Sequence, residues 1–264
     1  MYNGVTISVV IPCYNEAAGI GETLRGIPDY VDEIVCVDNN SKDNTVEIAR
    51  AAGAVVVPEP KQGYGHALLG GFRAATKDVI VTMDGDGTYP AVQIAELVDI
   101  LEREQLDFIT CSRFPLKRKD AMRFRNVVGN YALSLIFGLL YGKWLRDSQS
   151  GMWVFRRSIL PLMHLEGGSW EFSGQIKIEA STNPYIKFKE VPIDFYPRYG
   201  KSHFHGWLAA IKVGIHDIRW MVAQRFVNRR ARQQKAYDSL TPEQRQALEA
   251  RAKSSVAPTD PGHQ

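Results

Sequence analysis

The chain has 264 residues, 45% of them hydrophobic, which suffices for one large α/β domain with an appendage and excludes a wholly disordered or fibrous protein. A formal net charge of +3 is too small to indicate nucleic-acid binding by charge alone. The three cysteines lie in apolar runs without CxxC spacing, which argues against a zinc site or a disulfide framework and favours buried thiols in a reducing compartment.

The N-terminal segment does not resemble a signal peptide, because a strand-like apolar run begins almost directly after Met1. No apolar run reaches the length of about 18 residues that a membrane-spanning helix requires. From the sequence we therefore expect a cytoplasmic protein.

Strands and helices are predicted to alternate along the first part of the chain. Four short apolar runs predict parallel strands, at Val5–Ile11, Glu33–Val37, Val55–Val57 and Val79–Met83. The segments between them predict helices, at Ala17–Ile27, Asp43–Ala52 and His66–Ala75. Such alternation is typical of a Rossmann-like α/β fold with a doubly wound, mostly parallel sheet.

Polar turns follow three of the predicted strands, at Pro12–Glu16, Asp38–Ser41 and Asp84–Asp86. In a doubly wound sheet, ligands bind beyond the carboxyl ends of the strands, so we expect these turns to meet at one edge. The chain lacks a GxGxxG fingerprint after its first strand, a Walker loop and a GxSxG elbow. This argues against a nicotinamide enzyme, a phosphate-loop hydrolase and a serine esterase.

The turn after the fourth predicted strand, in the segment VIVTMDGDGTYP, has the pattern of a metal site. Asp84 and Asp86 lie two positions apart, so that in extended backbone both carboxylates project to the same side and can contact one divalent cation. Gly85 and Gly87 allow a tight turn. A hard cation with oxygen ligands usually carries phosphates, which predicts a metal-bound diphosphate; a plain acidic turn is the alternative.

With these turns placed, the sequence resembles the family 2 glycosyltransferases of the GT-A fold, most closely the polyprenyl-phosphate group typified by dolichyl-phosphate mannose and glucose synthases. The resemblance extends from Ser8 to about Phe204 and rests on the segments SVVIPCYNE, EIVCVDNNSKDNT, KQGYGHALLGGFRAA, VTMDGDGTYP, DFITCSR, RDSQSGMWVFRRS and PRYGKSHF. It implies that the protein transfers a sugar from a UDP- or GDP-hexose to the phosphate of a membrane-embedded polyprenol, with inversion and with Mg²⁺ or Mn²⁺.

The resemblance also implies which residues bind the donor. The nucleotide-sugar site would consist of Pro12, Tyr14, Glu16, Asp38, Asp84, Gly85, Asp86 and Arg113. In it the base would stack by Tyr14 and bond to Asp38, while Asp84 and Asp86 would hold the metal, Asp86 by direct contact. The sequence departs from the family pattern at Asn39, where many members have a second aspartate, and at Gly87, where others often have leucine. These departures leave the base preference and a third metal ligand open.

The predicted catalytic set consists of Asp86, Arg113, Asp147 and Arg198. The resemblance places Arg113 and Arg198 against phosphate oxygens, a task that suits the planar fork and permanent charge of arginine. The acceptor phosphate would be bound by Arg198, Ser202 and His203. Because His203 replaces the usual lysine of the family, phosphate binding is expected to be weaker or pH-dependent.

The identity of the acceptor decides whether a base is needed. A phosphate monoester is mostly dianionic at pH 7 and requires orientation, whereas a sugar hydroxyl would require a carboxylate base. Asp147 and Glu171 are the candidates for such a base, although Asp147 has a turn role as its alternative. Two other functions therefore stay open: a soluble family 2 transferase that acts on a sugar hydroxyl or a small molecule, and an inactive nucleotide-sugar-binding protein.

Three segments are expected along the chain: a GT-A catalytic domain over 1–205, an amphipathic interfacial or docking helix over 206–227, and a charged tail over 228–264. The tail is predicted to contain a short helix at about 242–253, after the capping box Thr241–Gln244, and a disordered end. The docking helix carries apolar and basic residues. The apolar segment Val127–Leu145 follows a basic run that contains Arg113, Lys117, Arg118, Lys119, Arg123 and Arg125. We expect them to contact a membrane surface, with a docking surface or a second subunit as alternatives; no nucleic-acid partner is expected.

Overall fold

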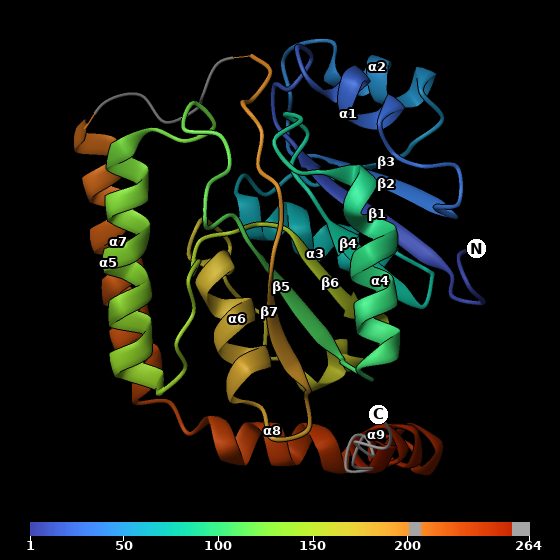
Figure 1. Ribbon diagram of the computed structural model, residues 1–264, viewed down its shortest axis with the longest axis vertical. Coiled ribbons are helices and arrows are strands. Elements are labelled where there is room, and N and C mark those ends of the chain that lie inside the picture. Colours follow the sequence, from blue (N-terminus) through green and yellow to red (C-terminus); the bar gives the residue numbers. More distant parts are fainter. Residues whose placement is uncertain (201–206, 255–264) are drawn as a thin grey trace, which may run out of the picture.

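The structure, a computed structural model, describes residues 1–200 and 207–254 and contains a seven-stranded sheet with the order β3-β2-β1-β4-β6-β5-β7 (Figure 1). The strands are β1 (Ile7–Cys13), β2 (Glu33–Asp38), β3 (Val55–Pro58), β4 (Val79–Thr82), β5 (Phe108–Ser112), β6 (Trp153–Arg156) and β7 (Phe188–Pro192). Strand β6 is antiparallel to both of its neighbours, and the other pairs are parallel. The expected mostly parallel sheet is therefore confirmed.

Helices cover both faces of this sheet (Figure 1). They are α1 (Ile20–Arg25), α2 (Thr45–Ala51), α3 (Tyr64–Ala74), α4 (Ile94–Arg103) and α6 (Phe172–Thr182), with short 3₁₀ helices η1 (Ala91–Gln93) and η2 (Arg157–Leu162). Successive side chains of a strand point to opposite faces, so Val9 and Val10 enter different cores. Val9 packs in the core that contains residues of α1, α2 and α4, and Val10 packs in the core that contains residues of α3, α6 and η2.

The helices α5 (Phe124–Tyr141) and α7 (Trp207–Arg225) lie side by side, away from the sheet (Figure 1). A small core that includes Phe137 and Met221 joins them, and the Tyr141 hydroxyl donates a hydrogen bond to the Met221 carbonyl at 2.6 Å. Among residues 1–200 and 207–254, no helix combines the length and the apolar character needed to cross a bilayer.

The C-terminal segment differs from the charged tail that the sequence predicts. An additional helix, α8 (Arg229–Asp238), precedes α9 (Pro242–Ser254), which covers the helix predicted at about 242–253. Leu240 and Leu248 are buried in the same core as α3 and α6, and Arg251 bonds to the buried Asp107 at 2.9 Å. Residues 228–254 are thus packed on the rest of the α/β fold, whereas the predicted disordered end lies outside the described residues.

Candidate active site

The three polar turns meet at the carboxyl ends of β1, β2 and β4, as the parallel strand order requires. The first two turns are joined by hydrogen bonds from the Asn15 amide to Ser41 Oγ at 3.0 Å and from the Glu16 amide to Thr45 Oγ1 at 2.8 Å. The third turn is attached through Thr23, whose hydroxyl donates to the Gly85 carbonyl at 3.1 Å. Pro12 lies within β1 and Asp38 ends β2, so every predicted donor residue of these turns borders this edge.

The carboxylates of Asp84 and Asp86 are held by different neighbours. Oδ1 of Asp86 accepts hydrogen bonds from the Thr88 amide at 3.1 Å and the Thr88 hydroxyl at 2.7 Å. Oδ1 of Asp84 accepts a weaker hydrogen bond from the Tyr64 hydroxyl at 3.3 Å. Burial, together with the charges of Asp86 and Glu16, raises the pKa of Asp84 to about 7. This excess of negative charge suits a bound cation.

Gly87 has a structural reason to differ from the family pattern. Its φ angle is +76°, and a Cβ atom there would lie 2.4 Å from the ring of Tyr199. A leucine at this position would therefore displace Tyr199. No cluster of three or more His, Cys, Asp or Glu residues suited to a metal occurs within the described part of the chain. Asp84 and Asp86 are the two carboxylates of this turn.

Asn39 holds the loop that connects β3 to α3. Its buried side chain donates hydrogen bonds to the carbonyls of Glu59 at 2.9 Å and Lys61 at 2.7 Å, and its Oδ1 accepts one from the Gly63 amide at 2.7 Å. An ionised aspartate cannot donate to those carbonyls. The replacement of aspartate by asparagine therefore braces the loop that leads into α3.

Arg113 and Asp147 form a buried, bidentate ion pair. Nε and Nη2 of Arg113 donate to the two Asp147 oxygens at 2.6 and 2.8 Å, and the Arg113 amide donates to Oδ2 at 3.0 Å. Burial would raise the pKa of Asp147, but the charge and hydrogen bonds of Arg113 outweigh burial and lower it. Asp147 is fully buried with both oxygens engaged. In this geometry both oxygens of Asp147 position Arg113, and the role of Asp147 as a proton-accepting base stays a prediction.

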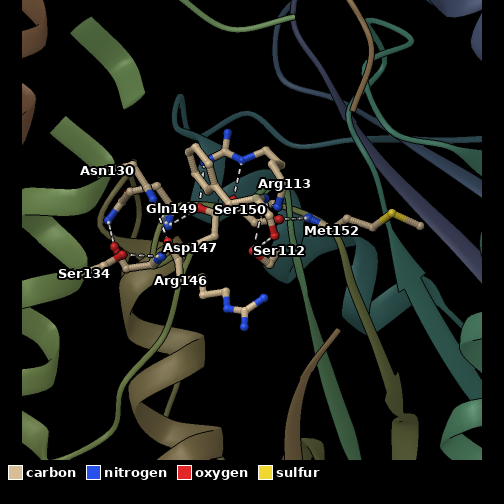
Figure 2. A network of polar contacts seen from close by, with 12 residues as sticks. Ser112, Arg113, Asn130, Ser134, Arg146, Asp147, Gln149, Ser150 and Met152 are labelled. Atoms are coloured by element: carbon tan, nitrogen blue, oxygen red, sulfur yellow. Dashed lines mark hydrogen bonds and ion pairs between the residues drawn. The ribbon is translucent and has the colours of Figure 1, made fainter. Parts of the chain in front are cut away.

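The turn that carries Asp147 is held by α5 (Figure 2). Asn130 donates to the Arg146 carbonyl at 3.0 Å, and Ser134 Oγ accepts a hydrogen bond from the Ser148 amide at 3.0 Å. From β7, Glu190 accepts a hydrogen bond from the Asp147 amide at 3.0 Å. The orientation of Arg113 thus depends on polar residues from two other elements, α5 and β7.

Glu171, the second predicted base candidate, is also engaged. Its Oε1 accepts hydrogen bonds from the amides of Gly168 at 3.1 Å and Ser169 at 3.0 Å, at the beginning of α6. Its Oε2 lies 3.4 Å from His216 Nε2 on α7. These contacts hold the loop that precedes α6 and bring Glu171 close to α7.

Arg198 does not point away toward a separate acceptor site. Its Nη2 donates to Glu16 Oε1 at 3.1 Å, and its Nη1 lies 3.4 Å from Asp86 Oδ2. The other predicted acceptor residues, Ser202 and His203, lie outside the described residues. Arg113, the first residue of the predicted basic run, points inward to Asp147 and does not contribute to a basic surface.

The sequence prediction omitted several buried residues of the site. The Nζ of Lys177, on α6, donates to the Ser150 carbonyl at 2.7 Å, and burial lowers the pKa of Lys177 to about 7. The Tyr89 hydroxyl accepts a hydrogen bond from the Gly151 amide at 2.7 Å. Lys177 stands between Ile176 and Ile178, but the surrounding segment SGQIKIEAS is mixed in polarity, so no local sequence signal identifies Lys177 as buried.

Comparisons with known proteins agree with this architecture. The model of the Glycosyl transferase family 2 matches residues 8–161. The dolichyl-phosphate hexose transferase of Haloferax volcanii is 30% identical over 83% of this chain and 95% of its own length. The low-salt glycan biosynthesis hexosyltransferase Agl6 of the same organism is 30% identical over 82% of this chain, but the matched part is only 53% of that longer protein.

Solved structures show the same fold. The glucosyl-3-phosphoglycerate synthase of Mycobacterium tuberculosis superposes with a TM-score of 0.63 at 22% identity, covering 84% of this chain and 80% of that one. The sheet order, the turns at its edge and the family match lead to one assignment. The chain belongs to glycosyl transferase family 2, has the GT-A fold and is a glycosyltransferase.

Proposed function

We propose that this glycosyltransferase moves a hexose from a UDP- or GDP-hexose to the phosphate of a polyprenol, with inversion at the anomeric carbon. The observation that carries the proposal is the bidentate pairing of Asp147 with Arg113. The other candidate base, Glu171, uses Oε1 to accept hydrogen bonds from two backbone amides, and its Oε2 is buried 3.4 Å from His216. A phosphate acceptor needs no base, since it is already mostly dianionic at pH 7. A sugar hydroxyl would need one of these carboxylates to be available.

The relatives support the same acceptor class. One is named a dolichyl-phosphate hexose transferase, and a second, from Methanococcus voltae, is named a UDP-N-acetylglucosamine–dolichyl-phosphate N-acetylglucosaminyltransferase. The latter is 27% identical over 78% of this chain and 92% of its own length. Neither name fixes the sugar or the base for this chain, which is why the donor is proposed as a class.

We further propose that Asp84 and Asp86 hold Mg²⁺ or Mn²⁺, since a synthase with this fold was crystallised with Mn²⁺ and UDP. The residues fit a cation because two carboxylates lie together with Glu16 and the pKa of Asp84 is raised. A cation at this place would stabilise the negative charge on the departing diphosphate. Thr88 fixes the Asp86 carboxylate by two hydrogen bonds, so this ligand is preorganised.

The protein's own side chains would orient the two phosphates of the reaction. Arg113, held on two sides by Asp147, can direct its remaining N–H groups to the diphosphate of the donor. Arg198 can turn its guanidinium to the acceptor phosphate, together with the predicted Ser202 and His203. Fixed positive charges stabilise a developing diphosphate most effectively in a partly buried site such as this one.

We also propose that the enzyme works at a membrane surface, on the cytoplasmic side. Exposed apolar side chains occur on α5, on α7 and directly after α7, and we call them the outer apolar face: Phe124, Val128, Leu135, Leu139, Ile211, Ile215, Val222 and Phe226. Leu139 is 70% and Phe226 85% exposed. The exposed basic residues Arg123, Lys143, Lys212 and Arg219 lie on or beside the same helices. An apolar face with basic neighbours is typical of helices that bind anionic lipid.

The test is a transfer assay with radiolabelled UDP- and GDP-hexoses, polyprenyl phosphate and Mn²⁺, followed by extraction into organic solvent. We expect labelled lipid from at least one donor. Label that appears only on a water-soluble acceptor would establish a soluble transferase instead. Donor binding without transfer to either acceptor would establish a nucleotide-sugar-binding protein.

A further inference from the structure

Residues 193–200, which we call the strap, lie along the acidic turn after β4. The Tyr196 amide donates to the Thr88 carbonyl at 3.0 Å, and the Tyr199 amide donates to the Asp86 carbonyl at 2.8 Å. The Tyr199 ring fills the space that a side chain at Gly87 would need. The backbone of the strap is therefore fixed to the turn, and Arg198 is placed directly beside its carboxylates.

The guanidinium of Arg198 bridges Glu16 and Asp86. Its Nη2 lies 3.1 Å from Glu16 Oε1 and 3.4 Å from Glu16 Oε2, and its Nη1 lies 3.4 Å from Asp86 Oδ2. Thr88 already occupies the other oxygen of Asp86. The oxygen that remains for a metal is therefore the one that faces Arg198.

These charges are largely shielded from water. The side chains of Arg198, Glu16 and Asp86 are 26%, 13% and 9% exposed. Partly buried charges attract one another more strongly than exposed ones, because less water screens them. A divalent cation that binds Asp86 Oδ2 has to displace the guanidinium, since two cations cannot share this position.

We propose that Arg198 is an internal substitute for the divalent cation: it neutralises Asp86 and Glu16 until the metal binds, and its displacement then frees it for the acceptor phosphate. This inference rests on the proposed function. Arginine keeps its charge throughout the physiological pH range, so Arg198 changes its position and not its protonation state. The exchange favours binding of the metal and nucleotide sugar before the acceptor, because the acceptor's arginine becomes available only afterwards.

The test is a titration of the full chain with Mn²⁺ alone, in which free Mn²⁺ is followed by electron paramagnetic resonance. In Arg198→Gln the competing charge is gone, so we expect Mn²⁺ to bind roughly tenfold more tightly than in the wild type. Transfer to polyprenyl phosphate should fall in the same variant. Arg198→Lys keeps a charge but loses the fork, and should give a smaller gain in Mn²⁺ affinity.

Arg103→Gln is the matched control, since Arg103 ends α4 and pairs with Glu104 at 3.8 Å, away from the acidic turn. It removes the same charge and should leave Mn²⁺ affinity unchanged. Equal or weaker Mn²⁺ binding by Arg198→Gln, or an equal gain in Arg103→Gln, would overturn the inference while leaving metal use intact. If neither the wild type nor Arg198→Gln binds Mn²⁺ even with UDP present, the metal part of the proposed function fails as well.

Discussion

At the residue scale, uncharged side chains determine the shape of the acidic edge. Thr88 fixes one oxygen of Asp86, and Asn39 joins three backbone groups of the loop before α3. Both act through hydrogen bonds that a carboxylate or an apolar group could not replace. Positions that look like departures from a family pattern are in this chain parts of the scaffold.

The role of Asn39 can be measured as stability. Asn39→Asp removes two donated hydrogen bonds and buries a charge, so the free energy of unfolding should fall by roughly 2–4 kcal/mol. Urea unfolding would measure this change. Asn40→Asp is the control, because Asn40 makes a single exposed hydrogen bond, to the Pro60 carbonyl. If both substitutions cost the same, Asn39 has no special role in bracing the loop.

The Arg113–Asp147 pair predicts a loss of both stability and activity. Asp147→Asn leaves a buried guanidinium without its counter-charge, which should reduce the free energy of unfolding by roughly 3–5 kcal/mol. It should also lower kcat/KM by about a hundredfold, because Arg113 loses its orientation. Asp120→Asn, which breaks the exposed pair with Arg118, should change neither quantity measurably. Unchanged kcat/KM in a folded Asp147→Asn variant would contradict the positioning role.

The raised pKa of Asp84 predicts a pH dependence of metal binding. At pH 6 this carboxyl is mostly protonated, since its pKa is about 7, and the proton competes with the cation. We expect Mn²⁺ to bind roughly tenfold more weakly at pH 6 than at pH 8. Without metal the sign for stability is opposite. A carboxyl that holds its proton more tightly when folded contributes stability that is lost as the pH rises from about 4 to 7.

Calorimetric Mn²⁺ titrations at the two pH values would test this dependence. Asp84→Asn removes the titrating group, so its weaker Mn²⁺ binding should no longer vary over this range. The same pH dependence in Asp84→Asn as in the wild type would assign the effect to another group, such as Lys177, whose pKa also lies at about 7.

At the element scale, α5 has two different sides. One carries Asn130 and Ser134, which hold the Asp147 turn, and another carries the α5 part of the outer apolar face. The helix contains no charged residue between Arg125 and Lys143. A long uncharged helix with an exposed apolar side is unusual unless that side binds something.

The outer apolar face can be tested by vesicle flotation. Leu135→Glu combined with Leu139→Glu should weaken binding to anionic phospholipid vesicles at least tenfold, because two apolar contacts are lost and two negative charges are added. Val92→Glu is the control, since Val92 is exposed on η1 and lies outside the outer apolar face. If the wild type does not float with anionic vesicles, or the double variant floats equally well, the membrane proposal is wrong.

The helix α8 could not be predicted from a hydrophobic pattern in its own sequence. Its residues RRARQQKAYD contain almost no apolar positions, so no amphipathic period could predict it. The helix is instead held from outside, by stacking of Tyr237 on Tyr185 with ring centroids 4.0 Å apart and by Arg229 over the Tyr141 ring at 4.8 Å. Asn228 caps its first turn by accepting a hydrogen bond from the Ala231 amide.

At the scale of the whole molecule, the sequence predicted the sheet and the meeting of its turns, since both follow from short apolar runs and from the geometry of parallel strands. It did not predict that Arg198 would contact Glu16, which is 182 positions away. Such a contact depends on how the strap packs, and no local pattern records that. The ion pair of Arg113 with Asp147 was missed for the same reason, although both residues had been singled out.

Because α8 and α9 pack on the catalytic domain, we expect a substitution in α9 to change the stability of the whole chain. Arg251 supplies the counter-charge of Asp107, which is 2% exposed at the start of β5. Arg251→Ala should therefore lower the free energy of unfolding of the whole chain by roughly 2–4 kcal/mol, in a single cooperative transition. Chemical denaturation followed by circular dichroism would measure it. A separate early transition of α9 alone would show that the C-terminal helices are not part of the cooperative unit.

The hydrogen bonds of Asn130 and Ser134 give α5 a further property. If the outer apolar face lies among lipid headgroups as proposed, the same rigid helix sets the depth of the Asp147 turn, and with it Arg113, relative to the plane of the lipid phosphates. The enzyme then needs no separate device to bring a lipid phosphate to the right height. The position of the bilayer surface then determines the height at which the reaction centre lies.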